Sequence, residues 1–437
     1  DWFVVVGASV GVMLSHNLTT FMTFPMTGII IGAWSIWKLL EKVPLSKILT
    51  KWIQVFSALF LAGGLASFYL IPMYIEKAFI RTDIFLGGYF DYHLHFLYIR
   101  QFLDPTWAYG GSAWGPEDDI SFFLGWPLFI TVGLLLITIG GIFIQFIRLK
   151  EKQRKYVVHQ FIETSLPVLA WVLIFGVIAS LALFLSLLKS SVIWETLPLI
   201  ENLQFPWRWL SIVTGATTVL VVLVFKLISS MLDSTFLKER KYQKITKMLL
   251  ALLLIGGSLL HISYFKPEFW LDDETTLYYA DPLKIQTRMS DIMLDYIPST
   301  LKMVGTASDR NASDLNGLEP FNSLDPVYNT TDFSELQVLV DRPHQKLVSV
   351  SNESETQLIW PIADFPGWQV FIDGERADAI VTDYGLLAVN VPSGKHEVGA
   401  LFTNTQVRMF ADILSVTSLI ILFTAIIKSS KENSSIL

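Results

Sequence analysis

The feature that most constrains the fold of this 437-residue chain is a series of long apolar segments. Eight of them lie at residues 2–14, 18–37, 52–74, 126–147, 166–188, 209–227, 248–264 and 409–427. Most contain about the 20 residues that an α-helix needs to cross roughly 30 Å of hydrocarbon. Trp and Tyr stand at many of their ends, where amphipathic rings favour the membrane interface. The pattern predicts a polytopic α-helical membrane protein with about eight transmembrane helices.

Composition agrees with this class and excludes others. Apolar types make up 52% of the chain and charged residues 16%, whereas a soluble domain carries about 25% charged residues. This excludes a single ordinary soluble enzyme. The chain has no cysteine, which excludes disulfides, thiolate metal sites and a cysteine nucleophile. Because no basic patch of the kind that nucleic acid requires is apparent, we expect membrane lipid and no nucleic acid as a partner.

Basic residues in the loops predict the orientation in the membrane. Four loops hold 17 of the 32 Lys and Arg, at residues 38–51, 148–155, 226–247 and 428–431. These loops alternate with the remaining ones, and the positive-inside rule places them in the cytoplasm. The C-terminus is then cytoplasmic, and loops 75–125 and 189–208 and region 265–407 are extracytoplasmic. The predicted location is the plasma membrane of a prokaryote.

The predicted domains follow from this orientation. Residues 1–264 form a transmembrane domain of seven spans, and residues 408–437 form the final span with a cytoplasmic tail. Residues 265–334 are loop-rich. Residues 335–407 alternate with period two in short runs, which predicts a small β-sandwich just before the last helix. Between residues 266 and 403 there are 22 acids and 9 bases, a balance of −13, so the outer domain is acidic.

The start of the chain is unusual for a membrane protein. It begins with Asp1, and its first span has only about 13 apolar residues, roughly 20 Å of helix. We therefore expect that the sequence begins inside a longer protein. The alternative is a short hairpin at residues 14–25, with a first helix that is tilted or re-entrant.

The outer loop 75–125 concentrates groups that can bind and activate a sugar. Carboxylates can act as bases toward a hydroxyl, and aromatic faces can stack on sugar rings. The candidate bases are Asp91, Asp118 and Asp119, and the candidate pocket residues are His93, Arg100, Trp107 and Trp114. The alternative is an amphipathic helix at residues 89–103 lying flat on the membrane.

The same loop contains two groups of possible metal ligands. His93 and His95 could bind zinc if they lay on a strand, but a helix would direct them apart. The acidic run at residues 117–119 could hold Mg or Mn beside a phosphate, or be a solvated turn. No metal site and no certain cofactor are predicted, and a divalent cation remains an option.

Arg208 lies between two tryptophans at the outer mouth of a span, where a lipid phosphate would lie. A guanidinium can bind phosphate in a bidentate manner, and Gln204 and His16 are candidates to assist it. Arg208 could instead anchor the interface to ordinary headgroups. His16 could instead belong to a polar turn in which Asn17 caps the following helix.

Several residue strings resemble those of a known family. They are "LSHN" at residues 14–17, "GYFDYHLHF" and "PTWAYGGSAWGPEDDISFFLG" in the first long loop, "LQFPWRWL" at 203–210, "DYIPST" at 295–300, and "FPGWQVFIDGE" with "VPSGKHEV" before the last span. Together they resemble the C-terminal part of bacterial membrane proteins of the GT-C glycosyltransferase superfamily. The most similar groups are the YfhO-like proteins and the "6-pyruvoyl-tetrahydropterin synthase-related" membrane proteins.

The resemblance implies a GT-C-like fold and an inverting transfer of a sugar from a polyprenyl-phosphate donor to an envelope glycan acceptor on the outer face. It implies a carboxylate base in the first outer loop, a position that would fall upstream of Asp1, so Asp91, Asp118 and Asp119 are second-choice bases. Arg208, Gln204 and His16 would hold the donor phosphate, and the sandwich would recognise the acceptor. A lipid-linked saccharide transporter or flippase is an alternative, although the spans lack the central ionisable residues that transporters use. A non-catalytic envelope assembly protein is another.

Overall fold

The computed structural model describes residues 2–82, 86–148, 165–234, 240–267, 270–273, 280, 298–301, 332–383 and 385–434. These residues form two compact units. One unit consists of Asp1–Leu14, Val55–Ile84 and Trp270–Leu437, and the other of Ser15–Gln54 and Phe85–Phe269. Most of the predicted loop-rich segment 265–334 lies outside the described residues.

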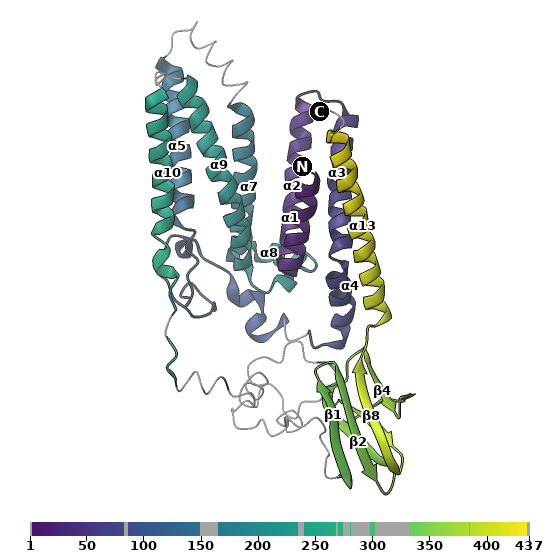
Figure 1. Cartoon of the computed structure of the whole chain (residues 1–437). Helices are drawn as coiled ribbons and strands as arrows, with labels where there is room; N and C mark the ends of the chain where they lie inside the picture. The colour runs from purple at the N-terminus through teal and green to yellow at the C-terminus, as the bar shows by residue number, and fades with distance from the viewer. Residues whose placement is uncertain are drawn as a thin grey trace. The chain divides into compact units, whose positions relative to one another are not determined.

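The unit built from Ser15–Gln54 and Phe85–Phe269 is mainly helical (Figure 1). Its long helices are α2 (Asn17–Leu40), α5 (Trp126–Arg148), α7 (Leu166–Ser186), α9 (Leu210–Ser234) and α10 (Arg240–Leu259). Helix α7 packs along α9. Their core contains Met22, Ile178, Trp194 and Trp209, with the half-buried Tyr92 packed against it. The core therefore joins membrane-type helices to residues of the loops 75–125 and 189–208.

Short turns of helix shape the loops of this unit. They are η3 (Gly88–Phe90), η4 (Tyr92–His95), η5 (Ile99–Phe102), η6 (Leu188–Ser190), α8 (Ser191–Thr196), η7 (Ile200–Leu203), η8 (Pro206–Trp209) and η9 (Ile262–Tyr264). The single interfacial helix considered for residues 89–103 is wrong. Asp91, Phe96 and Tyr98 have extended backbones, which divide the segment into three 3₁₀ turns.

In the other unit, α1 (Trp2–Ser15), α4 (Ser67–Glu76), η1 (Lys77–Phe79) and α13 (Gln406–Ser434) accompany the C-terminal part of α3 (Leu45–Leu65). Helix α13 packs along α4 (Figure 1). The single predicted span 52–74 is interrupted at Ala66, between α3 and α4. The N–H of Phe68 donates to Ser415 Oγ of α13 at 2.9 Å, so a side chain replaces the interrupted helical bond.

Two antiparallel sheets follow in the same unit. One has the order β1 (Glu335–Arg342), β2 (Gln345–Asn352), β8 (Gly394–Phe402), β4 (Trp368–Ile372) and β5 (Glu375–Ala377), and the other has β3 (Thr356–Ala363), β7 (Leu386–Val391) and β6 (Ile380–Val381). Val348 and Val398 of the first sheet share a core with Trp360 and Val389 of the second. This is the face-to-face packing of a sandwich. The sequence pattern missed only the short β5.

Six helices of the described residues are long and apolar enough to cross a membrane, two fewer than the eight predicted spans. The two exceptions are short. Helix α1 has 14 residues, about 21 Å at 1.5 Å per residue, and the apolar part of α10 covers only Lys247–Leu259. The predicted span 248–264 overran its helix because residues after Leu259 form a turn and η9, although they remain apolar.

Candidate functional site

A strained turn precedes Arg208. Gln204 has φ 60° and ψ −45°, and the N–H of Phe205 donates to the carbonyl of Leu203 at 2.6 Å. These values define a γ-turn with a positive φ at its centre, a rare and strained conformation. Leu199, five residues earlier, also has a positive φ of 69°. Strain of this kind persists only where the surroundings hold it, and it is concentrated at functional sites.

The turn holds the guanidinium of Arg208 in place. Nη1 of Arg208 donates to the carbonyl oxygen of Leu203 at 2.7 Å and to Oε1 of Gln204 at 2.9 Å. The guanidinium carbon lies 4.8 Å from the centre of the Phe205 ring, a cation–π distance. The half-buried cation is therefore fixed by the backbone, by an amide and by an aromatic face.

The ring of Phe205 joins this turn to the first outer loop. Its centre lies 4.6 Å from that of His95 and 6.0 Å from those of Tyr89 and Phe90. The Trp207 ring stacks on the Phe205 ring, with 5.1 Å between the two ring centres. Two loops far apart in the sequence thus meet around one phenyl ring beside the Arg208 cation.

A directed chain of hydrogen bonds fixes the same junction. His95 is 1% exposed, and its Nε2 lies 2.5 Å from the carbonyl oxygen of Tyr89. A carbonyl only accepts, so Nε2 carries the hydrogen and Nδ1 accepts from Ser112 Oγ at 2.7 Å. Ser112 Oγ in turn accepts from Trp207 Nε1 at 3.0 Å. His95 is therefore a structural residue that joins the loop to the tryptophan next to Arg208.

Asp91 and His93 form an accessible pair one residue beyond Phe90. Oδ1 of Asp91 accepts from the backbone N–H of His93 at 3.0 Å and from its Nδ1 at 2.6 Å. Burial raises the pKa of Asp91, but the two donors of His93 outweigh burial and the net pKa is below its ordinary value. The side chains of His93 and Asp91 are 51% and 41% exposed. A carboxylate that orients an imidazole is an arrangement suited to accepting a proton.

Tyr92 supplies an aromatic wall beside this pair; it belongs to the aromatic residues of loop 75–125 but is not one of the predicted pocket residues. Its ring stacks on His93 at 4.1 Å and on the buried Trp194 at 5.2 Å. Burial raises the pKa of Tyr92, and the charges of Glu195, Asp91 and Glu201 raise it further. These carboxylates therefore lie near the phenol. In the sequence, Trp194 and Glu195 of loop 189–208 are the aromatic and acidic residues that could have indicated a contact with Tyr92.

Asp118 and Asp119 serve the fold of the first outer loop. Oδ1 of Asp118 accepts from the N–H of Ala113 at 2.6 Å, and Oδ2 accepts from Nε2 of Gln101 at 2.5 Å. The backbone of Asp119 pairs with Gly110 and Gly111. Both oxygens of Asp118 thus close the loop, so Asp91 is a more suitable base than Asp118.

The remaining predicted residues lie elsewhere on this unit. Arg100 forms an exposed ion pair with Glu117 at 2.9 Å. Trp107 stacks on Tyr264 at 4.8 Å, and Trp114 is 64% exposed. His16 is the N-cap of α2, and its Nδ1 accepts from the N–H of Thr19 at 3.3 Å. The cap is therefore His16 itself and not Asn17.

Within the described ranges, no group of three or more His, Asp or Glu side chains is placed to hold a metal ion. No known protein family, curated protein or solved structure matches the chain. The resemblance to GT-C proteins therefore depends on the sequence strings alone.

Proposed function

We propose that this chain belongs to a glycosyltransferase of the GT-C type in the plasma membrane of a prokaryote. It would transfer a sugar from a polyprenyl-phosphate donor to an envelope glycan on the outer face. A membrane setting is supported by the six long apolar helices, whose apolar windows are only 11% to 33% buried within the chain. Exposed apolar surface on that scale is suited to a covering of lipid.

The observation that carries the proposal is the fixed cation at Arg208. Leu203, Gln204 and Phe205 hold the guanidinium before any ligand arrives, so little side-chain entropy remains to be lost on binding an anion. Arginine suits phosphate oxygens in charge and geometry. Because Arg208 lies at the start of the apolar helix α9, the anion it suits is one attached to a membrane lipid.

Asp91 and His93 supply the base in this proposal. The acceptor hydroxyl oxygen attacks the anomeric carbon of the donor sugar, and the bond from that carbon to the phosphate oxygen breaks. The phosphate leaves with the bonding electron pair, and its developing charge is stabilised by Arg208. The hydroxyl proton passes to the Asp91–His93 pair. The lowered pKa of Asp91 keeps that carboxyl ionised at neutral pH.

The test uses the protein in liposomes with radiolabelled polyprenyl-phosphate hexoses and a cell-envelope extract as acceptor. We expect label in a new glycan product, loss of at least about 100-fold in rate for Arg208→Ala, and partial recovery for Arg208→Lys. Arg342→Ala, an exposed arginine on β1, is the matched control and should retain the wild-type rate.

Two results would contradict the proposal: no product with any donor, or an undiminished rate for Arg208→Ala. A transporter would instead move labelled lipid between leaflets without forming a glycosidic bond, which a leaflet-specific digestion of the same liposomes measures. A non-catalytic assembly protein would do neither.

A further inference from the structure

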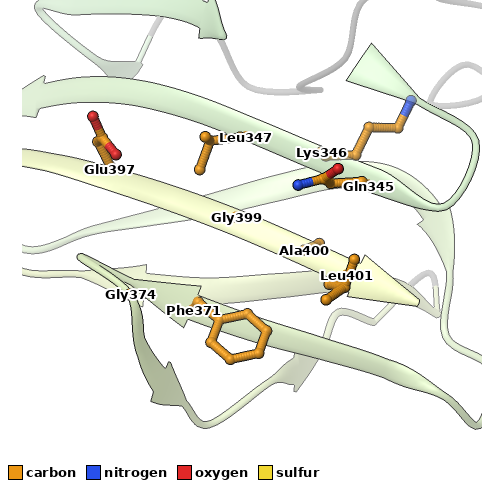
Figure 2. A pocket seen from close by; sticks show the side chains of 9 residues that line it. All are labelled: Gln345, Lys346, Leu347, Phe371, Gly374, Glu397, Gly399, Ala400 and Leu401. Carbon is orange, nitrogen blue, oxygen red and sulfur yellow. The ribbon is translucent and has the colours of Figure 1, made fainter. Parts of the chain in front are cut away.

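A groove crosses the outer face of the five-stranded sheet (Figure 2). It encloses about 210 Å³. Its floor is Gly399 in the central strand β8, which pairs with Leu347 of β2 on one side and with Phe371 of β4 on the other. The Leu347 side chain and the Phe371 ring therefore form apolar walls on the two sides of Gly399, which has no side chain.

Gly399 is present for space and not for backbone conformation, because its φ is not in the positive range that favours glycine. A Cβ added there would lie 3.2 Å from Leu347 Cδ1 and from the carbonyl oxygen of Lys346. The neighbours Val398 and Ala400 face the core of the sandwich. Glycine in the middle of a strand commonly marks a place where another molecule approaches the backbone.

Polar groups stand at the two ends of the groove. Glu397 lies at one end, and Gln345, which pairs with Leu401, lies at the other. Glu397 and Leu401 are four residues apart on β8, which corresponds to about 13 Å at 3.3 Å per residue. This length accommodates more than one pyranose ring. The carboxylate and the amide can each form two hydrogen bonds with hydroxyl groups.

The charges favour a neutral ligand. The Lys346 ammonium forms an ion pair with Asp341, so Glu397 is the remaining charged residue among those that line the groove and would repel an anion. The strand that forms the floor is paired on both sides, by β2 and by β4, so it offers no free backbone edge to an extended peptide. An apolar strip with hydrogen-bonding groups at both ends suits a sugar chain, which has apolar ring faces and hydroxyl rims.

Glu397 is held in position by the neighbouring hairpin. The N–H of Glu397 donates to Oδ1 of Asp373 at 2.8 Å, and the N–H of Asp373 donates to the carbonyl oxygen of Glu397 at 2.8 Å. Asp373 and Gly374 form the tip between β4 and β5, with φ values of 53° and 84°. The backbone at the acidic end of the groove is therefore fixed by hydrogen bonds to this hairpin.

We propose that this groove binds a neutral oligosaccharide, with sugar faces on Phe371 and Leu347 and hydroxyl groups on Glu397 and Gln345. Only the further statement that this saccharide is the acceptor rests on the proposed function. Binding itself does not depend on sugar transfer.

The experiment measures binding to the whole protein in lipid nanodiscs by isothermal titration and by saturation-transfer NMR. The probes are neutral tetrasaccharides of glucose, mannose, galactose and N-acetylglucosamine, with tetragalacturonate as the anionic comparison. We expect at least one neutral probe to bind, with a roughly tenfold higher Kd for Phe371→Ala and no detectable binding for Gly399→Val. Val381→Ala, which changes an exposed side chain of the other sheet, should bind as wild type.

The proposal is overturned if no neutral probe binds, if tetragalacturonate binds more tightly, or if Phe371→Ala and Glu397→Gln both bind as wild type. If Gly399→Val fails to fold, Phe371→Ala and Glu397→Gln still test the proposal. Binding without sugar transfer would contradict the proposed glycosyltransferase and leave the groove assignment intact. Sugar transfer that is unaffected by Phe371→Ala, in a protein that binds no probe, would contradict the groove assignment and leave the proposed glycosyltransferase intact.

Discussion

Arg408 and Glu76 form a bidentate ion pair that joins the end of α4 to the first turn of α13. Nε of Arg408 lies 2.9 Å from Oε1 of Glu76, and Nη2 lies 2.8 Å from Oε2. The two side chains are only 17% and 13% exposed. The guanidinium also lies 4.7 Å from the Phe402 ring centre. Within this unit, the pair ties the β-sandwich strand that precedes α13 to a helix more than 300 residues earlier in the chain.

Removing one partner of this ion pair should destabilise the protein strongly. Arg408→Ala leaves the Glu76 carboxylate mostly buried without its cation, a change that costs about 3 kcal/mol in comparable sites. The double variant Glu76→Gln/Arg408→Gln should recover part of that loss. Thermal unfolding in detergent measures both. Equal midpoints for wild type and Arg408→Ala would show that the pair contributes little.

Two adjacent glycines of α3 should differ in their tolerance of a methyl group. A Cβ on Gly64 would collide with Ser418 Oγ of α13 and lie 3.1 Å from its Cβ, whereas a Cβ on Gly63 meets nothing within 4 Å. We expect Gly64→Ala to unfold about 1–3 kcal/mol more easily than Gly63→Ala because it overpacks the helix contact.

The two variants share the same gain in helix propensity, so their difference isolates the packing effect. Chemical denaturation in mixed micelles measures it. Ser418→Gly should restore Gly64→Ala, and a failure to do so would place the strain elsewhere.

The sandwich should lose stability as the pH rises through the titration of His396. Its Nδ1 lies 2.7 Å from Oδ2 of Asp373. The hydrogen bond to Asp373 raises the pKa of His396 above 6.5, so its contribution is complete below that pH and is lost as the pH rises through the raised value. The hydrogen bond from His396 lowers the pKa of Asp373 below 3.8, so that contribution is lost only as the pH falls through the lowered value.

The measurement is the unfolding midpoint between pH 5 and pH 8.5. His396→Gln should flatten the slope, and His344→Gln, at an exposed histidine of the turn between β1 and β2, should leave it unchanged. Identical slopes for all three proteins would remove His396 as the cause.

Gln204→Ala should weaken donor binding through Arg208. The variant keeps the strained backbone but loses the hydrogen bond from Nη1 to Oε1, which is worth about 1 kcal/mol, or roughly a fivefold higher KM for the lipid donor. Asn202→Ala removes a nearby amide that caps its own turn at Leu199, and it should leave KM unchanged. A KM that both variants raise equally would indicate general disorder of the loop.

The parts of the fold with strong periodicity could be predicted from sequence. The apolar run at 166–188 predicts a helix and the alternating run at 346–351 predicts a strand, because composition and alternation are local properties of the sequence. The break at Ala66 could not be predicted, because Ser415, far along the chain, supplies the replacement hydrogen bond. The 3₁₀ turns around Asp91 escaped prediction because their aromatic composition also suits an interfacial helix.

The candidate site also has a part that the sequence predicts and a part that it does not. Arg208 was identified by its residue type and its position at the mouth of a span. Its support was not foreseeable, because the γ-turn at Gln204 and the Phe205 ring act through backbone shape and through contacts with Tyr89 and His95. The charge of Asp118 suggests a base, and only the fold reveals that Gln101 and Ala113 occupy its oxygens.

Strand β8, which carries the floor of the groove, ends at Phe402 and α13 begins at Gln406, so three residues separate this strand from a membrane-type helix. Thr403 fastens this short connection by donating both its N–H and its hydroxyl to the carbonyl oxygen of Gly367, at 2.7 and 3.0 Å. A connection of three residues that is bonded in this way leaves little room for β8 and α13 to move independently. Because the connection is short and bonded to the residue before β4, a displacement of the end of β8 would also displace the start of α13.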